Sequence, residues 1–68
     1  MLHGPHFLYV TTVDREVIIN PLHIVSIQRT NRDDTVITMS DGSDYYVQMS
    51  VRQIYERLEK IFGPIANL

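Results

Sequence analysis

The 68-residue chain contains no cysteine. This absence excludes disulfide bonds, cysteine-based zinc sites and cysteine nucleophiles. A chain of this length forms one domain and buries only about 60% of the surface that it exposes when unfolded, so we expect marginal stability. Without disulfides, self-association is a common way to supplement so small a core.

Long apolar runs and an excess of positive charge are also missing. The longest apolar runs, such as residues 17–19, are too short to cross a bilayer, and residues 1–7 lack a signal-peptide pattern. We therefore expect a soluble, cytoplasmic protein. Six Lys and Arg residues against eight Asp and Glu residues give a formal charge of −2, which disfavours nonspecific binding to phosphate backbones.

Aromatic and β-branched residues are concentrated in short stretches that predict β-strands. Two such stretches, residues 7–13 and 16–19, are separated by two polar residues, and we expect them to pair as a hairpin. Alternating side chains over residues 24–30 predict a third strand. The polar run 31–34 predicts a turn after it.

The dipeptide Asp41-Gly42 predicts a second hairpin, and two loop lengths are compatible with it. A two-residue loop would mix apolar and polar side chains on one face. A three-residue loop over 40–42, with Gly42 in a left-handed bulge, separates them. Because a buried face specifies strand register, we predict the longer loop. One buried face then carries Ile37, Met39, Tyr45 and Val47, and the outward face carries Val36, Thr38, Tyr46 and Gln48.

A helical period replaces the strand pattern after Met49. Ser50 and Gln53 have the spacing of a capping box, and Met49 and Ile54 have that of a hydrophobic staple. We predict a helix over residues 50–62 that ends at Gly63 in a left-handed conformation. Its apolar face, which we expect to pack on the sheet, carries Val51, Ile54, Tyr55, Leu58, Ile61 and Phe62.

The predicted fold is α+β and mainly β, with a small antiparallel sheet or SH3-like barrel of about five strands followed by one C-terminal helix. We expect residues 1–6 to be a flexible N-terminal segment and residues 7–68 to form a single small domain. No internal repeat, low-complexity tract or linker divides that domain.

The order of these elements resembles that of the small FlbD-like proteins, which are short bacterial chains linked to flagella. The resemblance rests on the helix that begins at Ser50 and on the segments VIINP (17–21), HIVSI (23–27), TVITMSDG (35–42) and YYV (45–47). It implies a partner within the motility machinery. The same order also resembles the first part of LytTR-type DNA-binding domains, which would imply a DNA-binding regulator.

Histidine, serine and glycine occur without the patterns that metal binding or catalysis requires. His3 has the spacing of an amino-terminal metal clamp, but any chain with histidine in third place has it, and His6 and His23 lack regularly spaced partner ligands. No nucleophile elbow surrounds a serine, and no glycine-rich loop precedes the helix. We predict no catalytic, cofactor or metal site and no enzymatic activity.

The outward face of the second hairpin is the predicted partner-binding surface, formed by Tyr46, Val36, Gln48 and Thr38. Tyrosine is favoured at interfaces because it offers a large contact area at low rotamer entropy. The alternative is a second core layer under the helix or the first hairpin. We predict a non-enzymatic protein-interaction module, bacterial or phage-encoded, that self-associates through a strand edge or the helix and binds a protein partner.

Two alternative functions are compatible with the sequence. DNA binding in the LytTR manner would require Arg15, Arg29 and Arg32 to converge on phosphates, and it predicts affinity that falls steeply with salt. The other alternative is a small ligand bound or sequestered at an oligomer interface. Within the protein-binding interpretation, a phage-borne inhibitor of a host protein would show the same sequence features as a motility protein.

Overall fold

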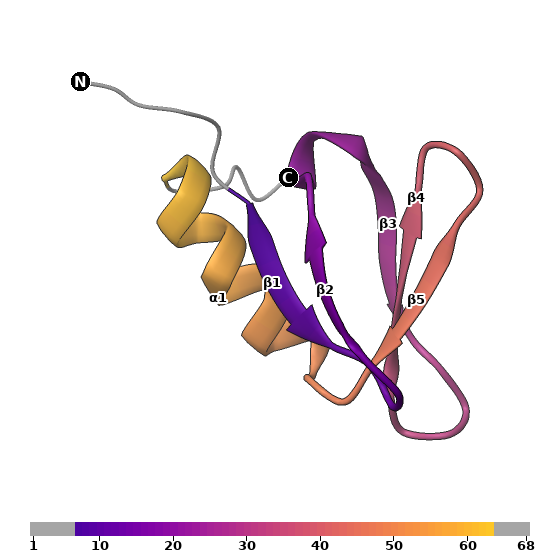
Figure 1. Cartoon of the computed structure of the whole chain (residues 1–68). Coiled ribbons are helices and arrows are strands. Elements are labelled where there is room, and N and C mark those ends of the chain that lie inside the picture. The colour runs from indigo at the N-terminus through magenta and orange to yellow at the C-terminus, as the bar shows by residue number, and fades with distance from the viewer. Residues whose placement is uncertain (1–6, 64–68) are drawn as a thin grey trace.

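The computed structural model describes residues 7–63, which form five strands, a short 3-10 helix and one α-helix. The two antiparallel sheets and the following helix confirm the predicted α+β, mainly β class (Figure 1). The predicted flexible segment 1–6 lies outside the described residues. In chain order the elements are β1 (Leu8–Thr11), β2 (Glu16–Ile19), η1 (Pro21–His23), β3 (Ile24–Arg29), β4 (Thr35–Met39), β5 (Asp44–Val47) and α1 (Val51–Phe62).

The strands form two sheets that are joined at one point. Strands β1 and β2 make a two-stranded sheet, and β3, β4 and β5 make a three-stranded sheet in that order. An isolated antiparallel bridge between Thr12 and Val47 links the end of β1 to β5. Strands β2 and β3 are therefore end strands, and the described part of the chain forms an open, bent arrangement in place of one continuous sheet (Figure 1).

The core lies where the two sheets and α1 meet. Burying these side chains is the main favourable contribution to folding, at about 25 cal/mol per Å² of apolar surface. Ile54 is the fully buried residue of α1, and Leu58 and Ile61 pack against the same cluster. Val51 and Phe62, which we predicted on this face, are 38% and 50% exposed. The buried cluster comprises Leu8, Val10, Ile19, Ile37, Val47 and Ile54.

The second hairpin has the predicted three-residue loop. The Met39 amide donates a hydrogen bond to the Ser43 carbonyl over 2.8 Å, and the Gly42 amide donates to the Met39 carbonyl over 3.0 Å. Gly42 has a φ of 92°, which glycine adopts more readily than other residues. The observed register pairs Ile37 with Tyr45, which confirms the prediction made from the buried face.

Helix α1 begins with the predicted capping box. The Ser50 hydroxyl accepts a hydrogen bond from the Gln53 amide over 3.1 Å, and the Gln53 side chain accepts one from the Ser50 amide over 2.9 Å. Met49 packs against the core cluster that contains Ile54. Gly63 has the predicted left-handed φ of 84°, whereas its ψ of −173° is extended and not that of a left-handed helix.

The 3-10 helix η1 is an element that we did not predict. The Asn20 side chain accepts a hydrogen bond from the Leu22 amide over 3.1 Å, and Pro21 occupies the first helical position. Asparagine before proline is a favourable start for a helical turn, so the sequence contained this signal. The 12-residue α1 is the longest helix of the described residues, and none there is long and apolar enough to span a bilayer.

Candidate protein-binding surface

The outer face of the three-stranded sheet carries an apolar pair, half-buried Val36 and exposed Tyr46. These residues are cross-strand neighbours on β4 and β5. Because Met39 and Ser43 form a hydrogen-bonded pair, the alternation along an antiparallel ladder makes Val36 and Tyr46 a non-hydrogen-bonded pair, whose side chains approach more closely. Tyr46 is 48% exposed and Val36 is half-buried.

The first hairpin and α1 pack on the opposite face of this sheet. That face contributes Ile37 and Val47 to the same buried cluster as Leu8 and Ile54. The alternative that Tyr46 lies in a second core layer under these elements therefore does not hold within the described residues. The aromatic side chain remains available to a partner.

Thr38 and Gln48, the other predicted contact residues, lie in different surroundings. The Thr38 hydroxyl donates a hydrogen bond to the Asp44 carboxylate over 2.8 Å on the outer face, beside the Val36–Tyr46 pair. Gln48 is exposed, but it lines a separate hollow at the start of α1, together with Ser50. The predicted surface is therefore divided, and Gln48 is not part of its apolar centre.

Val13 belongs to this surface, although its place in the sequence did not predict this. It is 81% exposed because β1 ends at Thr11, whereas the predicted strand ran through Val13. Val13, Val36 and Tyr46 line one hollow of about 520 Å³. An apolar residue next to the polar Asp14 turn was the available signal. The proximity of Val13 to Tyr46, however, depends on how the two sheets pack against each other.

Tyr46 and Val13 separate two hollows, and we call these two residues the Val13–Tyr46 ridge. Both residues line the hollow of about 520 Å³ and a second hollow of about 260 Å³. The larger hollow also contains Arg32, from the β3–β4 turn. The smaller hollow also contains Arg15, from the β1–β2 turn. One arginine therefore lies on each side of the ridge.

Arg29, the third arginine considered for DNA contacts, lies elsewhere. It forms an ion pair with Asp33 and lines the hollow at the start of α1 that also contains Gln48. The three arginines therefore do not line one common hollow. Arg15 and Arg32 instead each line one of the two hollows that Tyr46 also lines.

Threonine hydroxyls bind the carboxylates around the ridge. Thr12 donates to Asp14 over 3.0 Å, Thr38 donates to Asp44 over 2.8 Å, and Thr30 donates to Asp34. Within residues 7–63, the Arg29–Asp33 pair is the only one in which a cationic nitrogen lies within 4.0 Å of a carboxylate oxygen. The guanidinium groups of Arg15 and Arg32 therefore have no carboxylate partner among the described residues.

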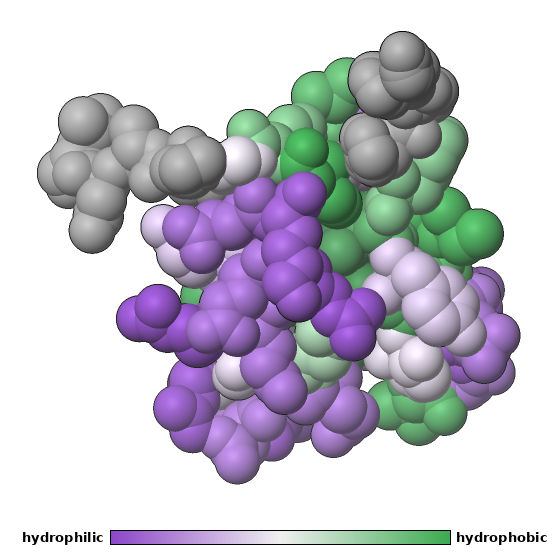
Figure 2. Space-filling view, turned by 90° about the vertical axis from the view of Figure 1, so that its left-hand side faces the viewer, coloured by the Kyte–Doolittle hydropathy of each residue, from purple (hydrophilic) through white to green (hydrophobic). Residues whose placement is uncertain are grey.

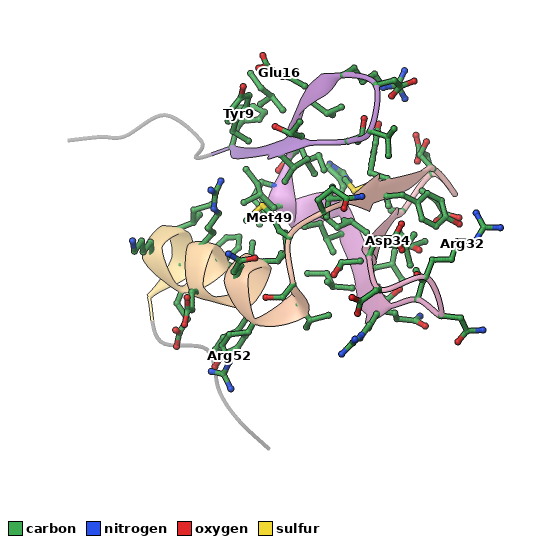
Figure 3. All side chains as sticks on the ribbon, turned by 90° about the horizontal axis from the view of Figure 1, so that it is seen from below. Tyr9, Glu16, Arg32, Asp34, Met49 and Arg52 are labelled. Atoms are coloured by element: carbon green, nitrogen blue, oxygen red, sulfur yellow. The ribbon has the colours of Figure 1, made fainter. Side chains whose placement is uncertain are left out.

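A second exposed tyrosine lies on the other sheet. Tyr9 is also 48% exposed and pairs with exposed Ile18 across β1 and β2. Hydrogen bonding to the Glu16 carboxylate raises the pKa of the Tyr9 hydroxyl because it stabilises the protonated form, and the negative charge of Glu16 acts in the same direction. Figure 3 shows Tyr9 and Glu16 together, away from Arg32. Tyr9 is thus a natural comparison for Tyr46.

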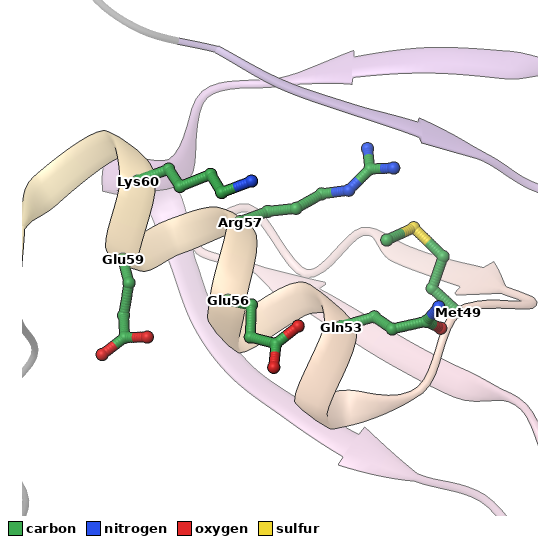
Figure 4. Close-up of a pocket in the computed structure, with 6 residues that line it drawn as sticks. All are labelled: Met49, Gln53, Glu56, Arg57, Glu59 and Lys60. Atoms are coloured by element: carbon green, nitrogen blue, oxygen red, sulfur yellow. The ribbon is translucent and has the colours of Figure 1, made fainter.

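The exposed face of α1 carries alternating charges. A hollow of about 570 Å³ there is lined by residues of both signs, and Figure 4 shows the Glu56 and Glu59 carboxylates pointing away from the Arg57 side chain. Figure 2 shows the hydrophilic surface that this face presents. Charges of both signs on a solvated helix face do not form a site for one ionic ligand.

His23 and Ser40 form the one serine–histidine contact of the described residues. The His23 Nδ1 atom and the Ser40 Oγ atom are 3.2 Å apart, and both side chains are exposed. Asp41 lies nearby, and its pKa is lowered mainly by hydrogen bonding to Ser43, with His23 as the smallest contributor. A hydrolytic site would also need an enclosed substrate pocket. No group of three metal-ligating side chains lies among residues 7–63.

The arrangement is that of a small open β-structure with an exposed aromatic ridge. The family model described as FlbD, flagellar and swarming motility proteins, matches residues 9–63. The chain therefore belongs to the FlbD family, which confirms the resemblance seen in its strand and hairpin segments. No curated protein and no solved structure matches the chain.

Proposed function

We propose that the chain is a cytoplasmic, bacterial, non-enzymatic protein that binds a protein partner of the motility machinery through the Val13–Tyr46 ridge. The observation that carries this proposal is that exposed Val13 and Tyr46 lie beside half-buried Val36, away from the core. Large apolar side chains grouped on a surface mark interaction sites more often than scattered ones do. Tyrosine is also enriched among residues that dominate binding energy.

Family membership supports a role without catalysis. The family is described by motility and not by a reaction. The ridge and the two hollows beside it present an aromatic ring, aliphatic side chains and two arginines, which suit recognition of another protein.

Self-association is the second part of the proposal. The backbone edges of β2 and β3 that face away from their sheets are available for pairing, because each is an end strand. Strand β3 has six residues, and it contains neither proline nor lysine, two residues that discourage edge pairing. Pairing through β3 would supplement a core that is small for independent stability.

In-cell crosslinking at Tyr46 tests the protein-binding proposal. We would place the photocrosslinking residue p-benzoylphenylalanine at position 46 and, as the matched control, at position 9, because Tyr46 and Tyr9 have the same exposed fraction. We expect position 46 to give a discrete crosslinked protein that position 9 does not give. Swarming should decrease in the Tyr46→Ala strain and persist in the Tyr9→Ala strain, at equal protein levels.

The same experiment has outcomes that oppose the proposal. Equal crosslinks from both positions would mean that the ridge is not a specific surface. Normal swarming of the Tyr46→Ala strain would remove the link between the ridge and motility. If the crosslinked species is nucleic acid, DNA binding replaces protein binding as the preferred function.

A further inference from the structure

The charged side chains near the ridge differ in whether they have a partner. Asp14, Asp34 and Asp44 each accept a hydrogen bond from a threonine hydroxyl. Arg15 and Arg32 have no carboxylate partner within residues 7–63. The two guanidinium groups are therefore cationic donors without an ion-pair partner in the described part of the chain, and a guanidinium group can bind a carboxylate through two parallel hydrogen bonds.

The ridge lies between Arg15 and Arg32. Tyr46 and Val13 line both hollows, with Arg32 in one and Arg15 in the other. A segment that crosses the ridge would place an apolar side chain against Tyr46 and its flanking residues over the two hollows. The chemistry that complements this order of groups is acidic, then apolar, then acidic.

We propose that the ridge recognises a protein segment with a large apolar residue between acidic residues, whose carboxylates bind Arg15 and Arg32. This inference rests on the proposed function, because it names the chemistry of the partner at the same surface. The apolar contact provides most of the affinity, and the two ion pairs provide selectivity. Exposed ion pairs contribute little individually, so we expect the acidic flanks to strengthen binding about fivefold.

Nucleic acid is a poorer occupant of the same surface. Asp14, Asp34 and Asp44 lie in the hollows beside the two arginines, so carboxylates interrupt the cationic groups that a phosphate backbone would follow. A phosphate backbone carries closely spaced charges and would meet these carboxylates as well as the guanidinium groups. Separate side-chain carboxylates can approach the two arginines and leave the aspartates in solvent.

Titration with three synthetic peptides tests the inference. The peptides share a central phenylalanine and differ in their flanks: acetyl-GSEDFDESG, its amide counterpart acetyl-GSQNFNQSG and its basic counterpart acetyl-GSKKFKKSG. Binding to the full ¹⁵N-labelled chain is followed by NMR. We expect the acidic peptide to bind about fivefold tighter than the amide peptide. The largest shifts should occur at Val13, Val36 and Tyr46.

Charge-removing variants show whether the two arginines cause that preference. In the Arg15→Gln, Arg32→Gln double variant, the acidic peptide should bind no more tightly than the amide peptide. The matched control is Arg52→Gln, because Arg52 is an exposed arginine on α1, where it stacks over the Tyr55 ring 5.9 Å from its centroid. This control should keep the full preference for the acidic peptide.

Several outcomes would overturn the inference. They are equal affinity for the acidic and amide peptides, tighter binding of the basic peptide, shifts centred away from the ridge, and no binding of any peptide at millimolar concentration. An oligonucleotide that binds through both arginines and competes with the acidic peptide would also overturn it. If crosslinking at position 46 succeeds while the acidic preference is absent, the proposed function stands and only the partner chemistry fails.

Discussion

Arg57 Nη1 donates a hydrogen bond to the main-chain carbonyl oxygen of Tyr9 over 3.0 Å. The Thr12 amide donates to Arg15 within the first hairpin, so the alternation of the ladder directs the Tyr9 carbonyl away from β2. The bridge to β5 lies further along the chain, at Thr12. The arginine of α1 thus binds a part of the β1 edge that no strand covers within the described residues.

Removing the Arg57 hydrogen bond should loosen the contact between α1 and β1. We expect Arg57→Met, which keeps an unbranched side chain, to lower the free energy of unfolding by about 1 kcal/mol, because the Tyr9 carbonyl loses a charged donor. Urea denaturation measures the change. Lys60→Met is the control on the same exposed helix face and should change stability by less than half as much. Equal effects of the two substitutions would show that the hydrogen bond does not stabilise the fold.

The capping box should behave as one unit. Ser50→Ala removes the acceptor for the Gln53 amide and should cost about 1 kcal/mol of stability. Gln53→Ala should cost less, because it exposes only the Ser50 amide to solvent. The double variant should be less destabilised than the sum of the two, since both substitutions break the same reciprocal pair. Urea denaturation of the four proteins tests this prediction, and strict additivity would contradict it.

The loop of the second hairpin should make stability depend on acid. The Ser43 main-chain amide donates to the Asp41 carboxylate over 2.9 Å, and this hydrogen bond holds the pKa of Asp41 below its ordinary value of 3.8. A lowered folded-state pKa means that the contribution is fully present above the unfolded-state pKa. The contribution disappears as pH falls through the folded-state pKa.

Asp41→Asn tests this acid dependence, because asparagine keeps an oxygen acceptor for the Ser43 amide but cannot titrate. Between about pH 5 and about pH 2, the wild type should lose more stability than the variant. The urea midpoint of each protein is measured across that range. Parallel pH curves for the two proteins would show that Asp41 does not contribute to the acid dependence.

Pairing through the edge of β3 can be separated from side-chain effects at Arg29. The Thr30 amide donates to the Asp34 carbonyl over 2.9 Å, so the neighbouring Arg29 amide points to the free edge of the sheet. Arg29→Pro removes that amide, and Arg29→Ala keeps it while losing the same ion pair to Asp33.

Sedimentation measures the dissociation constant of the oligomer for these variants. If chains pair in antiparallel fashion through β3, Arg29→Pro should raise this constant about tenfold, because a symmetric pair loses two hydrogen bonds. Arg29→Ala should leave it nearly unchanged. A similar increase in both variants would assign the effect to the arginine side chain and not to the strand edge.

The sequence predicted only some of the residues that form the candidate binding surface. Alternation placed Val36, Thr38 and Tyr46 on the outward face, because side-chain direction in a strand follows directly from sequence spacing. It also grouped Gln48 with them, although Gln48 faces another hollow at the start of α1. Val13 was missed, because its exposure follows from the early end of β1.

Local patterns in the sequence determined the class of the fold, the register of the second hairpin and the start of α1. Each depends on residues a few positions apart, where a loop glycine, a capping box or an apolar period restricts the backbone directly. The tertiary structure alone decided that Val13 lies beside Tyr46 and that Arg57 reaches Tyr9. These contacts depend on how two sheets and a helix pack around one core, and strand and helix periods specify faces without specifying which faces meet.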